Sequence, residues 1–371
     1  MSVNTILVTG GFGQVGKRCC ELLLDRGRTV IAMDLRTDRS VAAADELSGP
    51  ARPGTLVPAF VDLLDPAAVA GLVDEHHPDA IVHLAARLAP ASYPNPAAAG
   101  RVNVEGTGNV VAAATALDRP PLFVLASSAS VYGSRNPYRY PELITDETPV
   151  DPIDHYGRDK ILAETIVRES GLPYAVLRLG GVISPDGMSG ADRTHLVLIR
   201  ATPRDNRIHA VDARDVALAF ANAVDRADSI DGRTLLIAGD ESYRKLQREL
   251  EDDMTQSIGL GRLGPSVSLP GDPADDRGWT FTGWFDTTES EALLDFQRHT
   301  WSETREWIAH SQARSRTLLL RTFGPVLRPA IRLLMAVQRR RDGRGDYADP
   351  WTLFEKTYGP DVLANKGSER P

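Results

Sequence analysis

The sequence predicts an α/β fold, in which a doubly wound parallel sheet is accompanied by a smaller C-terminal lobe. Two observations lead to this prediction. In the first 180 residues, short runs of β-branched and aliphatic residues alternate with stretches of helical periodicity. The apolar runs are almost continuous, which is typical of strands that helices bury on both faces. We therefore expect strands over 5–8, 29–33, 56–61, 80–84, 122–125 and 174–177.

The segments between these strands favour helices, and amphipathic stretches at 14–25 and 103–117 are examples. After about residue 179 the pattern becomes irregular. There we expect a loop-rich stretch over 180–207, a helix over 211–226, a strand over 234–237, surface loop over 259–283, and helices over 290–298 and 302–312. The predicted organisation is a sheet domain over 1–180, a lobe over 181–312 interleaved with that domain, and an extension over 313–371.

The composition is that of a globular protein. The 371 residues are 42% hydrophobic and 25% charged, with a formal net charge of −8, which argues against a nucleic-acid partner. Cys19 and Cys20 are adjacent and point apart on a helix, so no disulfide is expected. The N-terminus lacks signal-peptide features and no run is apolar enough to cross a membrane. We therefore expect a cytoplasmic protein.

The extension differs in composition from the rest of the chain. Residues 313–341 hold eight arginines and no acidic residue, interleaved with large apolar residues. This favours either peripheral contact with an anionic membrane surface or a packing or dimer-contact extension whose arginines face water. Pro325 and Pro329 are expected to break the segment into short pieces. Three aromatic residues beyond it are expected to dock back onto the body: Trp351, Phe354 and Tyr358.

A glycine-rich turn follows the first predicted strand. Residues 9–16 read TGGFGQVG and open the first helix. Glycines let the backbone turn sharply and approach a pyrophosphate, whose charge is stabilised at a helix N-terminus. Its place between a strand and a helix makes this pattern specific for a Rossmann-type dinucleotide site. The residues expected to contact the dinucleotide here are Gly10, Gly13, Gln14, Val15 and Gly16.

An acidic residue, Asp34, ends the second predicted strand about twenty residues after the glycines. A carboxylate there accepts hydrogen bonds from the adenosine ribose and repels a 2′-phosphate. Arg36 and Arg39 follow closely and would weaken that preference. NAD is therefore the predicted cofactor, with NADP less favoured, and no metal site is predicted.

A tyrosine and a lysine four residues apart are the main catalytic signal. At this spacing Tyr156 and Lys160 share one face of a helix. A nearby ammonium stabilises a phenolate, so the tyrosine is expected to exchange a proton with a substrate oxygen nearer neutral pH. The lysine is also expected to hold the nicotinamide ribose. Upstream, the serine cluster at 127–130 offers hydroxyls that hydrogen-bond the reacting oxygen.

Together these motifs resemble the NAD-dependent epimerase/dehydratase family of extended short-chain dehydrogenases/reductases. The resemblance runs over roughly residues 4–310 and implies that Tyr156 is the general acid/base, Lys160 the residue that tunes it, and Ser128 the hydroxyl that orients the reacting oxygen. Its markers are residues 9–16, 83–86 (HLAA), 127–133 (SSASVYG), 156–160 (YGRDK), Arg178 and 209–217.

The resemblance also has implications for the cofactor and for assembly. It implies that Asp62 and Leu63 contact the adenine end, that Ala85 lines the cofactor, and that the protein is a homodimer. Ala86, the helix-opening Asn103, and the catalytic Tyr156 and Lys160 complete the predicted cofactor-binding residues.

Departures from the family pattern concern the substrate. Sugar-nucleotide 4,6-dehydratases of this family place Thr-Asp-Glu where this chain has the serines and alanine of 128–130, which argues against dehydration of that type. Gly181 replaces a familiar asparagine after Arg178. No sugar-nucleotide pocket is evident over 182–212, although arginines there could grip a diphosphate: Arg193, Arg204 and Arg207.

The sequence thus predicts an NAD-dependent oxidoreductase that transfers hydride at a secondary alcohol or ketone of a small-molecule substrate, with Tyr156 as acid/base. A close alternative is a sugar-nucleotide epimerase that oxidises and re-reduces one carbon and retains its NAD. A second alternative is a non-catalytic NAD-sensing protein, which needs the glycine loop but neither Tyr156 nor Lys160.

Overall fold

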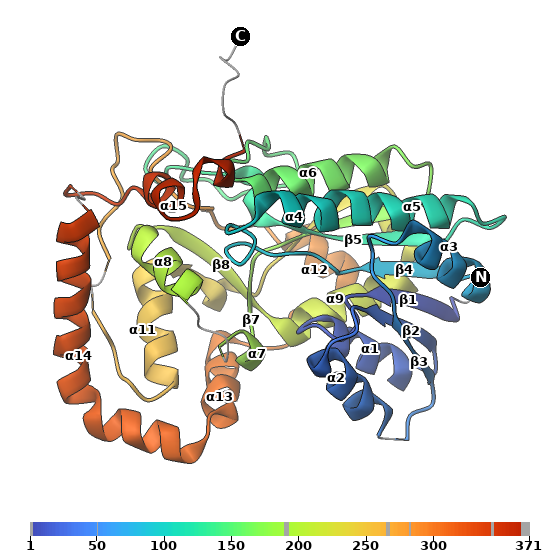
Figure 1. Cartoon of the computed structure of the whole chain (residues 1–371), viewed down its shortest axis with the longest axis horizontal. Coiled ribbons are helices and arrows are strands. Elements are labelled where there is room, and N and C mark those ends of the chain that lie inside the picture. The colour runs from blue at the N-terminus through green and yellow to red at the C-terminus, as the bar shows by residue number, and fades with distance from the viewer. Residues whose placement is uncertain are drawn as a thin grey trace, which may run out of the picture.

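A seven-stranded, fully parallel sheet forms the centre of the computed structural model, which describes residues 3–49, 51–188, 193–264, 268–281, 283–342 and 345–364. The strand order is β3-β2-β1-β4-β5-β6-β9 (Figure 1). The predicted doubly wound α/β fold is confirmed. The strands are β1 (Thr5–Thr9), β2 (Thr29–Asp34), β3 (Thr55–Phe60), β4 (Ala80–His83), β5 (Leu122–Ser128), β6 (Tyr174–Leu179) and β9 (Arg233–Ile237).

Helices bury both faces of the sheet. Alternate residues of β1 show this, since Ile6 and Val8 pack against one group of helices and Leu7 against the other. Burial on both faces is the reason for the unbroken apolar runs in the sequence. The first group is α1 (Gly16–Asp25), α2 (Asp38–Ser48) and α9 (Ala213–Asp225), and the second is α3 (Pro66–His76), α5 (Gly106–Thr115) and α6 (His155–Arg168). A short helix α4 (Pro96–Gly100) and a π-helical turn (Arg101–Glu105) lead into α5.

The smaller lobe is built around a second sheet of three strands. Its order is β10-β8-β7, with β8 parallel to β7 and antiparallel to β10. The expectation of a loop-rich stretch over 180–207 is wrong, because β7, α7 and α8 lie in it. The three-residue strand β7 is defined by its partner β8 about thirty residues later, a non-local pairing that local periodicity does not reveal. The elements of this lobe are β7 (Gly181–Ile183), α7 (Pro185–Met188), α8 (Arg193–Ala201), β8 (Arg207–Asp212), β10 (Arg244–Leu246) and α11 (Gln247–Ser257). The short helix α10 (Ala227–Ile230) packs beside α9 in the large sheet domain.

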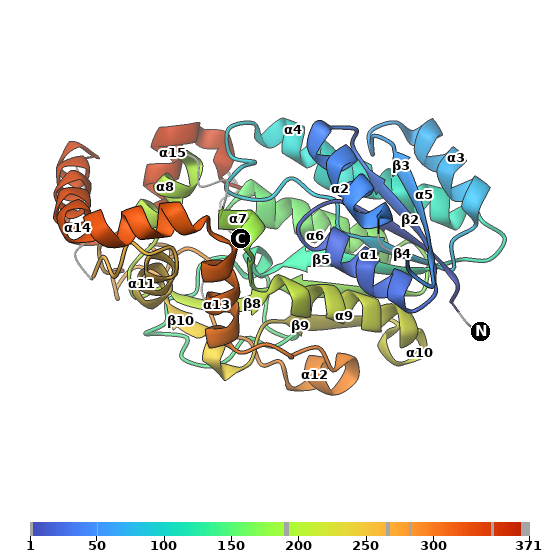
Figure 2. The ribbon, with the colours of Figure 1, turned by 90° about the horizontal axis from the view of Figure 1, so that it is seen from below.

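Helices α13 (Trp301–Ser311) and α14 (Arg314–Asp342) form an arm around this lobe, and α15 (Pro350–Tyr358) follows the arm. The short helix α12 (Thr288–Leu294), which precedes the arm, packs against α9 and β9 of the large sheet domain. The expectation that Pro325 and Pro329 break the basic segment is wrong, because α14 is one helix of 29 residues with both prolines inside it. Figures 1 and 2 show α14 as a bent arm at the end of the molecule opposite the N-terminus. A proline removes one backbone donor and kinks a helix, and packing against the lobe keeps the two parts continuous here.

Two of the aromatic residues beyond the arm dock onto the body, as expected. Trp351 and Phe354 are buried in a cluster with Tyr93 and Val197, and Tyr358 packs against the same cluster while partly buried. Residues 259–283 hold neither helix nor strand in their described part, apart from an isolated bridge at Phe281. Among the described residues, no helix combines the length and the apolar run that crossing a membrane requires.

Candidate active site

A large cavity lies between the carboxyl ends of the parallel strands and the smaller lobe. Its volume is about 1080 Å³, which is the upper end of the range for ligand pockets. It opens where the strand order reverses, between β1 and β4, which is the usual ligand position in an open α/β sheet. All but one of the sequence-predicted site residues line it: Gly10, Gly13, Gln14, Val15, Gly16, Asp34, Asp62, Leu63, Ala85, Ala86, Ser128, Tyr156 and Lys160.

The glycine loop forms a tight cradle after β1. Gly10 has a φ of +65°, which side-chain-bearing residues rarely adopt, and its carbonyl oxygen accepts a hydrogen bond from the Gly13 N–H at 3.0 Å. A Cβ on Gly16 would lie 2.0 Å from that same oxygen, so only glycine fits there. The loop therefore leaves backbone rather than side chains facing the cavity at the start of α1, as a pyrophosphate requires.

Asp34 ends β2 at the far end of the cavity. One carboxylate oxygen accepts the Phe12 N–H at 3.1 Å and the other accepts the Leu35 N–H at 2.8 Å. Burial raises the pKa of this carboxyl, while the two backbone hydrogen bonds and the charge of Arg39 oppose the rise. Arg36 lies over the Phe60 ring at 5.0 Å. The carboxylate is thus held in a fixed orientation at the wall.

Asn103 is the predicted cofactor-binding residue that does not line the cavity. Its side chain is buried and bonded to protein groups, since Oδ1 accepts the Arg87 N–H at 2.7 Å and Nδ2 donates to the Arg87 carbonyl at 3.1 Å. Nδ2 also donates to Asp159 at 3.2 Å. The amide therefore supports the loop after β4 from behind, and the expected contact of Asn103 with the cofactor stays a prediction.

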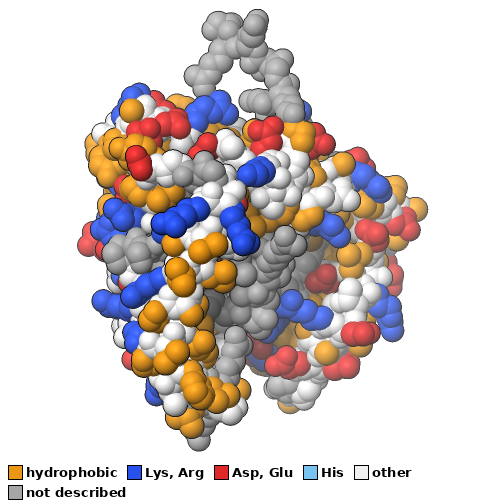
Figure 3. All heavy atoms as spheres, turned by 60° about the vertical axis from the view of Figure 1, so that its left-hand side comes forward, with side chains coloured by type: hydrophobic (Ala, Val, Ile, Leu, Met, Phe, Trp, Pro, Cys, Tyr) orange, Lys and Arg blue, Asp and Glu red, His pale blue; other side chains and the backbone are white. Residues whose placement is uncertain are grey.

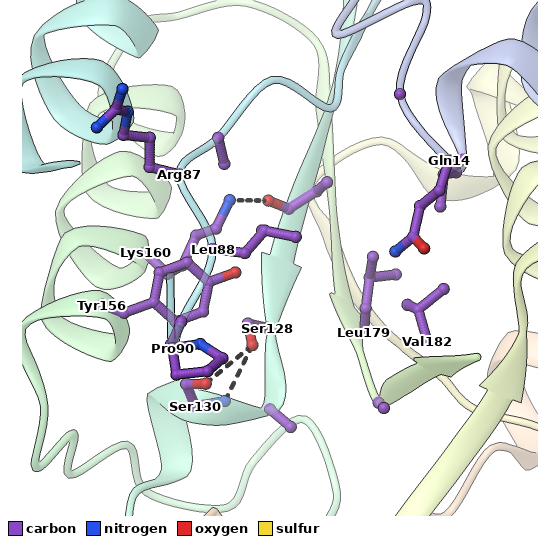
Figure 4. A pocket seen from close by; sticks show the side chains of 18 of the residues that line it. Gln14, Arg87, Leu88, Pro90, Ser128, Ser130, Tyr156, Lys160, Leu179 and Val182 are labelled. Carbon is purple, nitrogen blue, oxygen red and sulfur yellow. Dashed lines mark hydrogen bonds between the residues drawn. The ribbon is translucent and has the colours of Figure 1, made fainter. Parts of the chain in front are cut away.

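Tyr156, Lys160 and Ser128 meet at one side of the cavity (Figure 4). Tyr156 and Lys160 project from α6, and Ser128 ends β5. The Lys160 ammonium donates to the Ala126 carbonyl at 2.8 Å and lies 5.8 Å from the centre of the Tyr156 ring. The Ser128 hydroxyl donates to the Ser130 hydroxyl at 3.1 Å. Figure 4 shows Gln14, Leu179 and Val182 across the cavity from this group.

Burial dominates the protonation of the tyrosine and the lysine. It raises the pKa of the Tyr156 phenol, with a smaller contribution from neighbouring carboxylates, while a hydrogen bond with Ser128 opposes the rise. Burial lowers the pKa of Lys160 to about 8. Burial thus opposes the phenolate that the Lys160 ammonium is expected to stabilise, and the tuning of Tyr156 by Lys160 stays a prediction. Tyr156 holds its proton at neutral pH.

A buried ion pair locks α6 against the ends of β5 and β6. Arg178 donates to both carboxylate oxygens of Glu164, at 3.0 and 2.8 Å, and to the Tyr132 hydroxyl at 2.9 Å. Ser127 donates to Glu164 as well. Sequence reasoning used Arg178 only as a marker and missed its partner. The available signal was the spacing, since residues 156, 160 and 164 continue one stripe of α6.

The N-terminus of α6 is capped by a carboxylate that sequence reasoning also missed. Asp154 is fully buried and accepts the Gly157 N–H at 2.9 Å and the Tyr93 hydroxyl at 2.8 Å. Burial raises its pKa to about 6, although both hydrogen bonds oppose the rise. The cap fixes the first turn of α6, which carries Tyr156.

The smaller lobe supplies a mainly apolar wall opposite the sheet. Among the described residues of this wall there is no lysine or arginine, so Arg204 and Arg207 do not line the cavity, and the side chain of Arg193 lies outside the described residues. Glu251 is the wall's one carboxyl within the described part, and burial raises its pKa to about 7. The wall consists chiefly of Leu198, Ile199, Ile208, Leu250, Met254, Ile258, Leu263, Phe281 and Phe285.

Comparison with known proteins shows a matching family and several similar sugar-nucleotide enzymes. The model of the NAD dependent epimerase/dehydratase family matches residues 6–238. A UDP-glucose 4-epimerase of Schizosaccharomyces pombe is 30% identical over 200 residues, covering 51% of this chain and 55% of that protein. A UDP-glucose 4-epimerase of Lactobacillus helveticus is 30% identical over 204 residues, covering 52% and 57%. The chain thus spans little more than half the length of these curated relatives.

Solved structures share the fold over a longer stretch. The UDP-glucuronic acid 4-epimerase of Bacillus cereus, in complex with UDP-glucuronic acid and NAD, superposes with a TM-score of 0.65 at 18% identity, covering 83% of this chain and all of that one. The dTDP-glucose 4,6-dehydratase of Streptomyces venezuelae, with NAD bound, gives 0.65 at 21% identity, covering 83% and 97%. The family match covers more than half of this chain. The chain belongs to the NAD-dependent epimerase/dehydratase family.

Proposed function

We propose that this protein is an NAD-dependent oxidoreductase that transfers hydride at a secondary alcohol or ketone. One observation carries the proposal: Ser128, Tyr156 and Lys160 converge on the same cavity that the glycine loop enters. A scaffold that only sensed NAD would need the loop but not the three polar groups. NAD, the cofactor of the family, supplies the hydride acceptor when bound.

The residues of this chain fit that cofactor. The glycine loop would hold the pyrophosphate, because a Cβ at Gly16 would fill the cradle. Asp34 would bind the adenosine ribose, and Asp62 and Leu63 the adenine end. Lys160, which lies beside Tyr156, would hold the nicotinamide ribose.

The three polar groups would divide the proton chemistry. Ser128 donates a hydrogen bond to the reacting oxygen and orients it. Tyr156 accepts the proton of an alcohol during oxidation and donates one to a ketone during reduction. The Lys160 ammonium lies 5.8 Å from the centre of the ring, and its charge would favour the phenolate against the effect of burial.

The lining of the cavity bears on the substrate. A nucleoside diphosphate carries two or more negative charges, and sites that bind it present arginine or lysine. The described wall of the smaller lobe presents apolar side chains and Glu251 instead. This supports a lipophilic alcohol or ketone rather than a sugar nucleotide.

A sugar-nucleotide epimerase with retained NAD is the second candidate. The names of the curated relatives, which are UDP-sugar 4-epimerases, favour it. Besides Lys160, the described residues that line the cavity on the sheet side include two cationic ones, Arg87 and Arg101, which are the groups that would serve a diphosphate. We also propose that the protein is a homodimer, that it is located in the cytoplasm, and that residues 313–341 make peripheral membrane contact. The domain boundaries at residues 180 and 312 are likewise part of the proposal.

Replacing the tyrosine tests the proposed reaction. Tyr156→Phe should lower turnover of lipophilic secondary alcohols by roughly 10²–10⁴, as expected for a lost acid/base group, while the Kd for NADH stays the same. The rate of NADH formation measures turnover, and the amount of NADH formed per substrate consumed shows whether the reaction is a net oxidation. Tyr138→Phe, which changes an exposed surface tyrosine, is the control. Unchanged turnover in Tyr156→Phe would remove this residue from the mechanism. Conversion of a UDP-sugar without net NADH would favour the epimerase.

A further inference from the structure

The outer face of α14 exposes large apolar side chains in an unusual concentration. Leu319 and Leu333, for example, are 58% and 67% exposed. In the view that brings α14 forward, these side chains form a ridge with basic side chains beside it (Figure 3). We define the outer face by its exposed members: Leu318, Leu319, Phe323, Val326, Leu327, Leu333, Leu334 and Val337.

The spacing of these residues makes the face continuous despite the bend. Apolar residues recur at intervals of four and three along the whole helix, which places them in one stripe. The residues of the stripe are 319, 323, 326, 330, 333 and 337. The adjoining leucines at 318, 327 and 334 widen the stripe beyond the narrow seam of a coiled coil.

The opposite side of α14 is attached to the body. Met335 is buried against Leu263, and Ile331 packs against the same small cluster. The Arg332 guanidinium donates to the Leu263 carbonyl at 2.6 Å. Because the inner side holds the helix in place, the outer face is presented to the surroundings in a fixed orientation.

The charge of the segment is opposite to that of the whole protein. Residues 313–341 carry eight arginines and no acidic residue in a chain whose net charge is −8. Arg339, Arg340 and Arg341 lie in the last turn of the helix, just before its final residue Asp342, and Arg340 and Arg341 are exposed. A wide apolar stripe combined with arginines is the pattern of helices that lie in the surface of an anionic bilayer.

We propose that the outer face of α14 binds an anionic membrane surface. Each arginine near such a surface contributes about 1 kcal/mol, and the leucines enter the boundary between headgroups and acyl chains. A second copy of the chain is the less suitable occupant, because it would bring the exposed Arg321, Arg340 and Arg341 of one copy toward those of the other.

Membrane docking would also serve the cavity. Leu263 lines the cavity wall and packs against α14 at the same time, so the apolar wall extends to the docked helix. A lipophilic substrate dissolved in the bilayer would then reach the cavity along apolar surface. This consequence rests on the proposed function, whereas the docking itself does not.

Vesicle sedimentation of the full chain tests the docking. The protein should pellet with vesicles of phosphatidylcholine and phosphatidylglycerol, and far less with phosphatidylcholine alone. Leu319→Gln/Leu333→Gln should lower the partition coefficient by about a hundredfold or more, since both leucines lie in the exposed stripe and would enter the bilayer. Arg340→Gln/Arg341→Gln should lower it by about tenfold or more as well.

The matched control removes two exposed apolar side chains elsewhere. Val150→Gln/Leu162→Gln, at residues 39% and 40% exposed, should bind vesicles like the wild type. Thermal unfolding and NADH titration should be equal in all variants, which separates a failure of docking from a failure of the proposed reaction. Equal sedimentation of the leucine variant and the wild type would overturn the proposal. The proposal would also be overturned if the wild type is a dimer, the leucine variant is a monomer, and neither protein binds vesicles.

Discussion

At the scale of single residues, burial sets the protonation of the site. Tyr156 keeps its proton because desolvation raises the pKa of the phenol, whereas desolvation lowers the pKa of Lys160 to about 8. The same effect raises the pKa of Asp154 to about 6 from its ordinary value of 3.8. The proton on Tyr156 suits donation to a ketone, and its removal requires the charges that arrive with the ligands.

The raised pKa of Asp154 predicts a pH-dependent stability. The folded protein binds this proton more tightly than the unfolded chain, so the buried charge is destabilising above pH 6 and the penalty is relieved as the pH falls toward 3.8. Asp154→Asn keeps an acceptor for the Gly157 N–H and removes the charge. Between about pH 7.5 and about pH 4, the wild type should gain up to about 3 kcal/mol of unfolding free energy relative to this variant.

Urea unfolding at a series of pH values measures that difference. Asp65→Asn, which changes the exposed capping carboxylate of α3, controls for the loss of a cap. If the unfolding free energies of the wild type and Asp154→Asn change with pH in parallel over the whole range, burial does not destabilise the charged carboxylate of Asp154.

At the scale of elements, α6 is positioned by the ion pair between Glu164 and Arg178. Both side chains are buried, and removal of Arg178 leaves Glu164 with only the partly exposed Arg168, at 2.9 Å, as a cationic partner. Arg178→Met should therefore lower the unfolding free energy by about 3 kcal/mol, the lower end of the range for a broken buried pair. Arg233→Met, which breaks the exposed pair with Glu289, should lower it by no more than about 1 kcal/mol. Equal losses in the two variants would show that the buried pair is not what locks α6.

The elements themselves could be predicted unevenly from the sequence. β1, β2 and α1 were foreseen to within about two residues, because a buried parallel strand and the glycine turn after it carry strong local signals. β7 and α8 were missed, since their definition depends on contacts with distant parts of the chain. The continuity of α14 through its prolines was missed for the same reason.

The site residues, too, could be predicted only in part from the sequence. Residues that line the cavity were predicted from two local signals, the spacing of Tyr156 and Lys160 and the end of β5 at Ser128. The groups that hold them, Glu164 and Asp154, were missed because their importance comes from burial. Sequence pattern identifies residues that point at a shared space, whereas partners behind the wall emerge only from packing.

At the scale of the whole molecule, a family domain is combined with a basic arm. The family match ends at residue 238, while the smaller lobe and α14 continue beyond it. The part of the chain that would determine substrate specificity is therefore the part that the family match covers least. Its apolar cavity wall and the exposed stripe of α14 both support a lipophilic substrate.

The most direct test of the central claim is a fluorescence titration of the purified wild type with NADH and with NADPH. Saturable binding of one NADH per chain is predicted, with NADPH weaker by about tenfold or more because the Asp34 carboxylate repels a 2′-phosphate. Gly16→Val should abolish the binding and Tyr156→Phe should retain it. A folded wild type that shows no saturable NADH binding would contradict the assignment of this cavity to NAD and, with it, the proposed reaction.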